Sequence, residues 1–453
     1  MKNSQLTMKD EVKLDLGKTK VGRLFVEYYF PTLLSLSFSA LLNVIDGIFV
    51  GRGVGSDALA AVNVAAPVFM IATGIGLMLG SGISVVGAIH LSRGNQSAAG
   101  RCTTVGLAAT LLSGLVVALL VLLCPTSLCF LFGGSEALLP YVEDYLTNLW
   151  LGMLSYGLMV AGMFVVRLDG SPRFAMMTNV IPAVLNIVLD YIFVFPLDMG
   201  IGGAALATSI SGFVGVVIVC VYFAFFSRSL HVSVPSVRAA RGGVVGGEIL
   251  KMCKVGAPAL IGETAISFML VVGNYMFMGM LGEDGVAAFS VACYLMPLVF
   301  MFGNSVAQSA MPIVSYNHGC GQDARVRRTF RLSLVVGCVT GCLVSAAVFF
   351  FGDSLAVCFL DSSTAAYVLA ASGLPLFALG FLFFTLNVVL IGYLQSIECG
   401  RRASVFMFLR GYLLLLLLSF VMPCLLGEAG LWLTVPASEL ATFVLIAVTW
   451  WRP

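Results

Sequence analysis

The stretch GSDALAA at residues 55–61 recurs as GEDGVAA at residues 282–288, and this repeat organises the chain. Four of the seven positions are identical in the two stretches, which lie 227 residues apart. The same ungapped offset aligns glycines, prolines and an arginine over most of each half, so the sequence reads as two similar units in series. The aligned pairs include Pro31 with Pro258, Gly94 with Gly321, Arg101 with Arg328, Gly200 with Gly427, and Gly203 with Gly430.

Composition places the repeat in a membrane. Of the 453 residues, 60% are hydrophobic and only 10% are charged, which is outside the range of soluble domains. Apolar runs of twenty residues or more recur throughout, and each is long enough to cross a hydrocarbon core of about 30 Å as a helix. The runs do not alternate in period two, so a membrane β-barrel is excluded and helices must satisfy the backbone.

Twelve such spans are predicted, six in each repeat. Because six is even, the second half enters the membrane from the same side as the first, and the repeats are parallel. We therefore expect an all-α membrane protein of twelve transmembrane helices in two parallel, pseudo-symmetric six-helix lobes. The predicted spans are 25–50, 58–90, 102–124, 141–166, 174–196, 202–226, 252–280, 286–316, 329–351, 365–396, 403–425 and 430–451. The predicted domains are a tail at 1–22, an N-lobe at 23–226, a linker at 227–249 and a C-lobe at 250–453.

The basic residues predict the orientation. All 24 lysines and arginines except Arg52 and Arg410 fall on the side that holds the amino-terminal tail. Basic loops stay in the cytoplasm, so both termini are expected there, in a bacterial cytoplasmic membrane. Residues 1–22 are charged and lack the apolar core of a cleavable signal peptide.

Polar side chains inside the spans are candidates for function, because a charge near the bilayer centre costs roughly 2.5–3.5 kcal/mol on insertion scales. Asp46 and Asp190 lie about 6 and 9 Å below the outer ends of their spans at a rise of 1.5 Å per residue. Asn186 is one helical turn from Asp190, and Thr208 has a similar depth in the next span. These four residues are predicted to form one ion-coupling site.

Two carboxylates, an amide and a hydroxyl suit either a proton or a hard monovalent cation. They would act as metal ligands only if Na⁺ is the coupling ion. A structural alternative stands beside this interpretation, since acids near helix ends can extend to the interface and Asn or Thr commonly link helices. The site is not duplicated, because the offset aligns Asp46 with Gly273 and Asp190 with Leu417.

The second lobe carries three further charged residues within its spans. Glu263 and Arg410 have broadly similar depths, so mutual neutralisation is one expectation, and a coupling role for Glu263 is the other. Glu439 has no evident partner in the sequence, and we expect it to be structural or to line a cavity.

Other classes of function are disfavoured. The chain has no phosphate-binding loop, so an ATPase activity of its own is excluded, and no ATPase subunit, cofactor or nucleic-acid partner is expected. Three histidines and twelve cysteines without metal-binding spacing argue against an enzyme. Pseudo-symmetric bundles of this kind are typical of secondary transporters.

Three motifs resemble the multidrug and toxic compound extrusion (MATE) transporters, in particular bacterial members. They are DGIFVGRGVGSDALAA at 46–61, NIVLDYIFVFPLDMGIGGAALAT at 186–208 and AQSAMPIVSYNHGCG at 307–321. The resemblance implies a helix kink at Pro31, a coupling acid at Asp46 and a cation site at Asn186, Asp190 and Thr208. It also implies coupling or substrate roles for Glu263 and Gln308, to which we add Arg410. Met163 stands where some members carry asparagine, and span ten lacks the acid of another branch.

The sequence thus predicts an antiporter that exports amphipathic organic cations in exchange for H⁺ or Na⁺, with membrane lipid as its surroundings. The alternative is a flippase for a lipid-linked saccharide with the same architecture. A cationic groove and additional spans would favour the flippase, and the sequence offers one arginine within a span and twelve spans.

Overall fold

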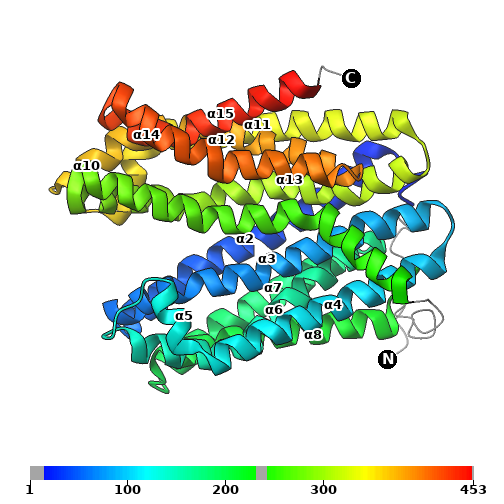
Figure 1. Ribbon diagram of the computed structural model, residues 1–453, viewed down its shortest axis with the longest axis horizontal. Helices are drawn as coiled ribbons and strands as arrows, with labels where there is room; N and C mark the ends of the chain where they lie inside the picture. The colour runs from blue at the N-terminus through cyan, green and yellow to red at the C-terminus, as the bar shows by residue number, and fades with distance from the viewer. Residues whose placement is uncertain (1–14, 231–241, 451–453) are drawn as a thin grey trace, which may run out of the picture.

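The computed structural model describes residues 15–230 and 242–450, and within these residues it contains helices and no strand. Two helical bundles lie side by side, one coloured blue to green and the other green to red (Figure 1). The first contains α2 (Val21–Gly53), α3 (Ser56–Ser92), α4 (Gln96–Leu123), α5 (Pro125–Leu131), α6 (Leu139–Leu168), α7 (Pro172–Val194) and α8 (Gly200–Phe225). The second contains α10 (Gly242–Gly319), α11 (Asp323–Phe359), α12 (Ala365–Ser396), α13 (Gly400–Phe408), η1 (Leu409–Leu413), α14 (Leu414–Leu426) and α15 (Glu428–Trp450).

The predicted spans are confirmed within a few residues at most boundaries. Eleven helices in the described residues are long and apolar enough to cross a membrane. One of them, α10, has a non-helical residue at Gly282 and contains two passes, so the chain crosses twelve times. The loop expected between 280 and 286 is therefore a break at one residue. The predicted linker overlaps the start of α10, and its residues 231–241 lie outside the described part.

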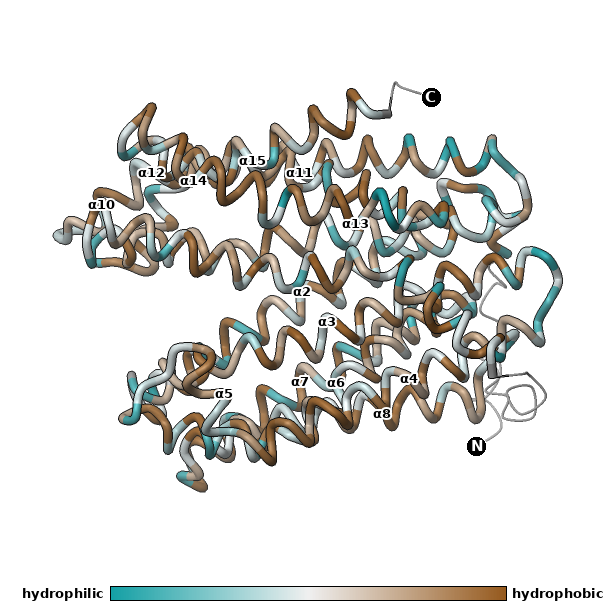
Figure 2. Tube along the Cα trace, viewed as in Figure 1, coloured by the Kyte–Doolittle hydropathy of each residue, from teal (hydrophilic) through white to brown (hydrophobic). Residues whose placement is uncertain are grey.

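Along the middle of the helices in both bundles the residues are mostly apolar, as expected for helices that cross a lipid bilayer (Figure 2). Polar colour concentrates at the two ends of the molecule, most strongly at the end on the right of the view. We call this the basic end, because the helices around it begin or finish next to Arg93, Arg101, Arg325 and Arg401. The opposite end, which holds Gly55 and Gly282, is called the distal end.

The repeat is visible in the backbone. Glycines aligned by the 227-residue offset adopt positive φ in both lobes, a conformation that glycine reaches without the cost that a Cβ brings. They break or end equivalent helices, so the two lobes change direction at equivalent places. The pairs are Gly55 and Gly282 (φ 125° and 67°), Gly94 and Gly321 (72° and 68°), and Gly200 and Gly427 (60° and 61°).

The hydrophobic cores show where the lobes meet. At the distal end each lobe has its own core, which includes Val50 and Leu149 in one lobe and Phe377 and Trp432 in the other. At the basic end two cores draw on both lobes. The larger includes Tyr28 and Met252, and the smaller includes Phe164 and Val255. Burial of apolar surface therefore holds the lobes together at the basic end only.

Polar contacts between the lobes follow the same pattern. Those nearest the distal end are Ser37 Oγ to Met301 Sδ at 3.3 Å and Ser267 Oγ to Met70 Sδ at 2.7 Å. Beyond them α2 and α3 run apart from α10, as the ribbons on the left of Figure 1 show. The described part of the chain is thus closed at the basic end, and its lobes separate toward the distal end.

Candidate functional site

Two acids from different helices meet inside the N-lobe, near the distal end. Asp46 is on α2 and Asp190 is on α7, and these helices also contact through Phe49 and Tyr191, whose ring centroids are 6.3 Å apart. The two carboxyl groups lie close enough to interact directly with each other. Asp190 is completely buried, so its side chain does not extend to the interface.

Asn186 and Thr208 complete the cluster. The Asn186 amide nitrogen donates to Oδ2 of Asp190 at 3.1 Å, and its oxygen accepts from the backbone N–H of Thr208 at 3.1 Å. This amide orientation satisfies both neighbours. The Thr208 hydroxyl donates to the carbonyl of Ala204 at 3.2 Å, which leaves its oxygen free to accept. The four residues that shared a predicted depth therefore do come together.

The cluster has unused capacity for a positive charge. Oδ1 of Asp46 and Oδ1 of Asp190 are buried and accept no hydrogen bond from any residue that the structure describes. Two carboxyl groups this close repel each other when both are ionised, and a proton or a small cation would reduce that repulsion. Buried oxygens without partners are costly, and a proton or a monovalent cation would satisfy them.

Two neighbours of the cluster were not identified from the sequence. Tyr145 on α6 is buried close enough to both Asp46 and Asp190 to interact with their charges. Asn179 on α7 donates to the carbonyl of Ser35 at 3.0 Å, to Ser35 Oγ at 2.9 Å and to Ser39 Oγ at 2.7 Å. Tyr145 and Asn179 are among many tyrosines and asparagines in the spans, and their spacing carries no distinguishing signal.

Asn179 bears on the predicted kink at Pro31. Proline removes one backbone donor from a helix and weakens it. Here α2 nevertheless continues without interruption from Val21 to Gly53. The Asn179 bonds join α7 to the turns that follow Pro31 and so support the helix where proline has weakened it.

Glu263 lies between the lobes, and the prediction that it pairs with Arg410 is wrong. An added Cβ at Gly74 on α3 would lie 3.4 Å from the Glu263 Cβ, and Glu263 is also near Tyr156 on α6. Its side chain therefore contacts the N-lobe. Arg410 is paired with Glu439, so it does not neutralise Glu263.

The partner of Arg410 is Glu439, which the sequence left without one. Arg410 Nε donates to the two carboxylate oxygens of Glu439 at 2.6 and 2.9 Å. Asn387 on α12 donates to Glu439 Oε2 at 2.8 Å, and Phe384 lies under the guanidinium at 4.2 Å. Depth along the helices was the basis of the wrong pairing. The rotation of η1 about its own axis, which turns Arg410 toward α15, was not accessible from the sequence.

Gln308 is also part of the boundary between lobes. Its Oε1 accepts from Arg167 Nη1 at 2.7 Å. Arg167 had been placed among the basic residues of the cytoplasmic side, and it does lie at the basic end. Only 2% of it is exposed, however.

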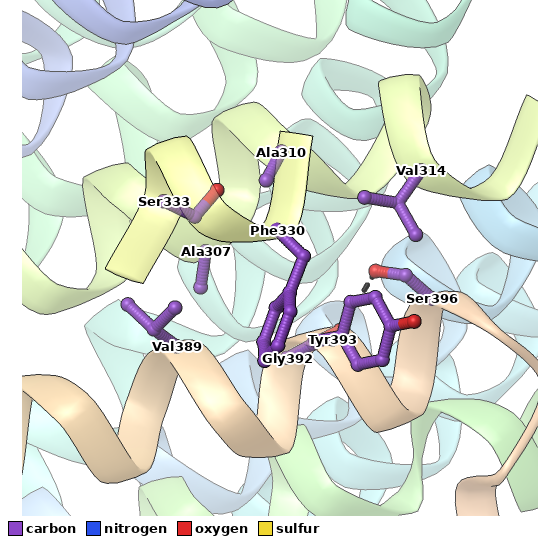
Figure 3. Close-up of a pocket in the computed structure, with 9 residues that line it drawn as sticks. All are labelled: Ala307, Ala310, Val314, Phe330, Ser333, Val389, Gly392, Tyr393 and Ser396. Atoms are coloured by element: carbon purple, nitrogen blue, oxygen red, sulfur yellow. Dashed lines mark hydrogen bonds between the residues drawn. The ribbon is translucent and has the colours of Figure 1, made fainter. Parts of the chain in front are cut away.

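The cavities lie away from the acid cluster. A small one of about 10 Å³ is lined by residues of α10, α11 and α12, with the tilted rings of Phe330 and Tyr393 beside it (Figure 3). It has room for about one water molecule. An apolar groove of about 710 Å³ lies on the C-lobe, with Phe349, Leu379 and Leu440 among the residues that line it.

Comparison with known proteins gives a consistent result. The MatE family model matches residues 31–192 and 258–421, and these two segments begin 227 residues apart, at the repeat offset. The chain is 24% identical over 436 residues to the multidrug export protein MepA of Staphylococcus saprophyticus, covering 94% of this chain and 92% of the relative. MepA of Staphylococcus aureus strain NCTC 8325 is 23% identical over 451 residues, covering 98% and 96%.

Solved structures agree in fold. A multidrug resistance MATE family transporter of the MOP superfamily, solved in an outward-facing conformation, aligns with a TM-score of 0.89 and 21% identity over 96% of each chain. The MATE transporter VcmN of Vibrio cholerae, solved as an aspartate-to-asparagine mutant, aligns with a TM-score of 0.87 and 17% identity over 95% of this chain and 96% of the other.

Proposed function

Because the chain belongs to the MatE family, we propose that it is a secondary antiporter that exports amphipathic organic cations in exchange for H⁺ or Na⁺. The observation that carries the proposal is the Asp46–Asp190 pair with its unused buried oxygens. This pair lies at the end of the molecule where the lobes separate. The names of the MepA relatives support export of small organic compounds.

The orientation follows from the charges. With the basic end in the cytoplasm of a bacterium, the distal end faces outward and the lobes separate toward the outside. An external ion then reaches Asp46 and Asp190 from outside, which is the side from which the coupling ion flows inward down its gradient. Neutralising the pair lowers the cost of withdrawing it from water, allows α2 to bend near Pro31 and favours release of the exported compound. Coupling is reciprocal, because ion and substrate must each disfavour the other's bound state.

Glu263 is suited to bind the exported organic cation. Its carboxylate lies at the boundary of the lobes and is not paired with Arg410. An organic cation that enters between the lobes would find a counter-charge there, whereas Arg410 is held by Glu439. We assign Glu263 to substrate binding and leave the Asp46 cluster to the coupling ion.

The test is efflux of ethidium from vesicles that contain the purified protein in known orientation, with ΔpH and a Na⁺ gradient imposed separately. Efflux driven by one gradient and lost in Asp46→Asn identifies an antiporter and its ion. Asp57→Asn is the matched control, because Asp57 is exposed at the start of α3 and belongs to no cluster. If folded protein moves no organic cation under either gradient, the proposal fails and the lipid-linked saccharide flippase takes its place.

A further inference from the structure

Two side-chain hydrogen bonds cross between the lobes near the basic end, one partly buried and the other fully buried. In one, Arg167 on α6 donates to Gln308 on α10 at 2.7 Å. In the other, Gln395 on α12 donates to Ser81 Oγ on α3 at 2.9 Å. Each therefore joins the fourth spanning helix of one lobe to the second spanning helix of the other.

The two bonds are related by the repeat. The acceptors Ser81 and Gln308 are 227 residues apart, which is the repeat offset. The donors match to within one residue, because Arg167 aligns with Leu394, next to Gln395. The seam between the lobes thus has the same approximate two-fold symmetry as the lobes themselves.

A second pair of contacts between the lobes is related by the 227-residue repeat offset, with no residue of difference. Tyr29 on α2 lies close enough to Ser305 on α10 for their side chains to interact. At the aligned positions, Gly256 on α10 approaches the Met78 carbonyl on α3 so closely that a Cβ would fall on it. The crossing of these helices is therefore repeated in the two lobes, as the two bonds are, so the pairing of the two bonds is part of the architecture.

The two bonds differ in strength. Gln395 and Ser81 form a neutral bond, and the Ser81 hydroxyl keeps its own bond to the Leu77 carbonyl at 2.7 Å if Gln395 is lost. Arg167 carries a full charge and is 2% exposed. Its other side-chain contacts are the sulfur of Met163 and the ring of Phe164, and no described carboxylate pairs with it. Gln308 is the one oxygen acceptor of the guanidinium in the described residues.

We propose that Arg167–Gln308 and Gln395–Ser81 are the paired latches that keep the basic end closed, with Gln308 as the dominant residue. The inference rests on the proposed alternating-access transport. When the lobes part at this end, Arg167 gains water, so the Gln308 oxygen that satisfies its charge in the closed state decides how easily that state opens. Loss of Gln308 alone leaves a buried, unsatisfied cation, which costs more than loss of the neutral bond.

A native cysteine reports on this closure without any transport measurement. Cys102 on α4 is completely buried, with its sulfur 3.5 Å from that of Met252 on α10 in the other lobe. Opening of the basic end separates the two residues. Cys129 is equally buried but lies in the N-lobe core at the distal end, so it serves as the internal reference.

The experiment measures the rate at which N-ethylmaleimide labels Cys102, resolved from other cysteines by peptide mass spectrometry. Gln308→Leu should raise the rate about tenfold, and Gln395→Leu by about threefold or less. Gln96→Leu, an exposed glutamine at the same end, is the control and should change nothing. Labelling of Cys129 should stay constant in every variant.

Two further variants keep the proposal open to refutation even if Gln308→Leu folds poorly. Gln308→Glu provides a carboxylate for Arg167 and should slow Cys102 labelling below that of the wild type. Arg167→Met with Gln308→Leu removes charge and acceptor together and should return the rate to the wild-type value or below it. Equal labelling in the wild type, Gln308→Leu and Gln308→Glu would overturn the latch and leave the antiport proposal untouched.

Discussion

Arg410 and Glu439 form an ion pair with 2.6 Å between nitrogen and oxygen, and only 9% and 7% of their side chains are exposed. Arg410 belongs to η1, a single turn of π-helix, and its carbonyl accepts from Ser438 Oγ at 3.0 Å. The first residue of η1, Leu409, aligns by the repeat offset with Pro182, inside α7. Equivalent helices are therefore perturbed at equivalent places in the two lobes.

The chemistry that follows each perturbation differs. In the N-lobe Asp46 and Asp190 lie together inside the bundle, and no basic residue in the described part of the chain is bonded to them. In the C-lobe the acid already has a permanent cation. The described residues of the C-lobe therefore offer no equivalent pair of unpaired acids, which agrees with the proposal that the coupling ion binds in the N-lobe.

Breaking the ion pair should destabilise the protein strongly. Arg410→Met or Glu439→Leu alone leaves a buried charge uncompensated, at a cost of about 3–5 kcal/mol. The double variant removes both charges and should recover most of that loss. Thermal unfolding of the detergent-solubilised protein measures the effect, and single variants as stable as the wild type would contradict the burial of this pair.

Asp190→Asn should abolish gradient-driven efflux, with a fall of at least about tenfold, while the protein keeps its fold. The reason is that an amide removes the negative charge that the coupling ion must neutralise. Asp198→Asn is the matched control, because Asp198 is exposed in the turn that follows the same helix. Efflux assays in vesicles measure transport, and size-exclusion profiles check that the variant is folded. Efflux at the wild-type rate from Asp190→Asn would show that this residue does not belong to the coupling site.

The sequence was sufficient for features that depend on position along a helix. Apolar length set the spans, the repeat set the two lobes, and depth brought Asp46, Asn186 and Asp190 together, because their helices are neighbours. Depth is only one coordinate, however. The pairing of Glu263 with Arg410 was wrong because the direction in which each side chain points is decided by packing against other helices, which a π-helical turn can alter.

Arg167 illustrates a second limit. Its position one residue before the end of α6 is compatible with a loop residue in water or with a side chain turned into the seam. A shift of one or two residues in a helix end decides between these, and boundaries of that accuracy are not obtained from hydropathy. Its bond to Gln308 required the arrangement of both lobes.

A side chain with a Cβ at Gly282, where α10 is broken, should destabilise the protein because of the backbone conformation alone. An added Cβ meets nothing within 4 Å, yet φ is 67°, so Gly282→Ala should lower the free energy of unfolding by about 1–2 kcal/mol. Gly279→Ala, three residues earlier in equally open space, has no such strain and should be neutral or stabilising by up to about 1 kcal/mol. Chemical denaturation measures the free energy of unfolding of both variants. Equal changes in the two would contradict a positive φ at Gly282.

The close approach of the lobes at Gly256 gives a prediction that links packing to closure. A Cβ at this position would fall on the carbonyl of Met78, which belongs to the backbone of α3 and cannot turn aside as a side chain would. Gly256→Ala should therefore push α10 away from α3, lower stability by about 1–3 kcal/mol and speed the labelling of Cys102. Gly246→Ala, in the same helix with nothing within 4 Å of an added Cβ, is the control and should leave the labelling rate unchanged. If both variants label Cys102 at the wild-type rate while stability falls only in Gly256→Ala, the crossing supports the fold without controlling closure.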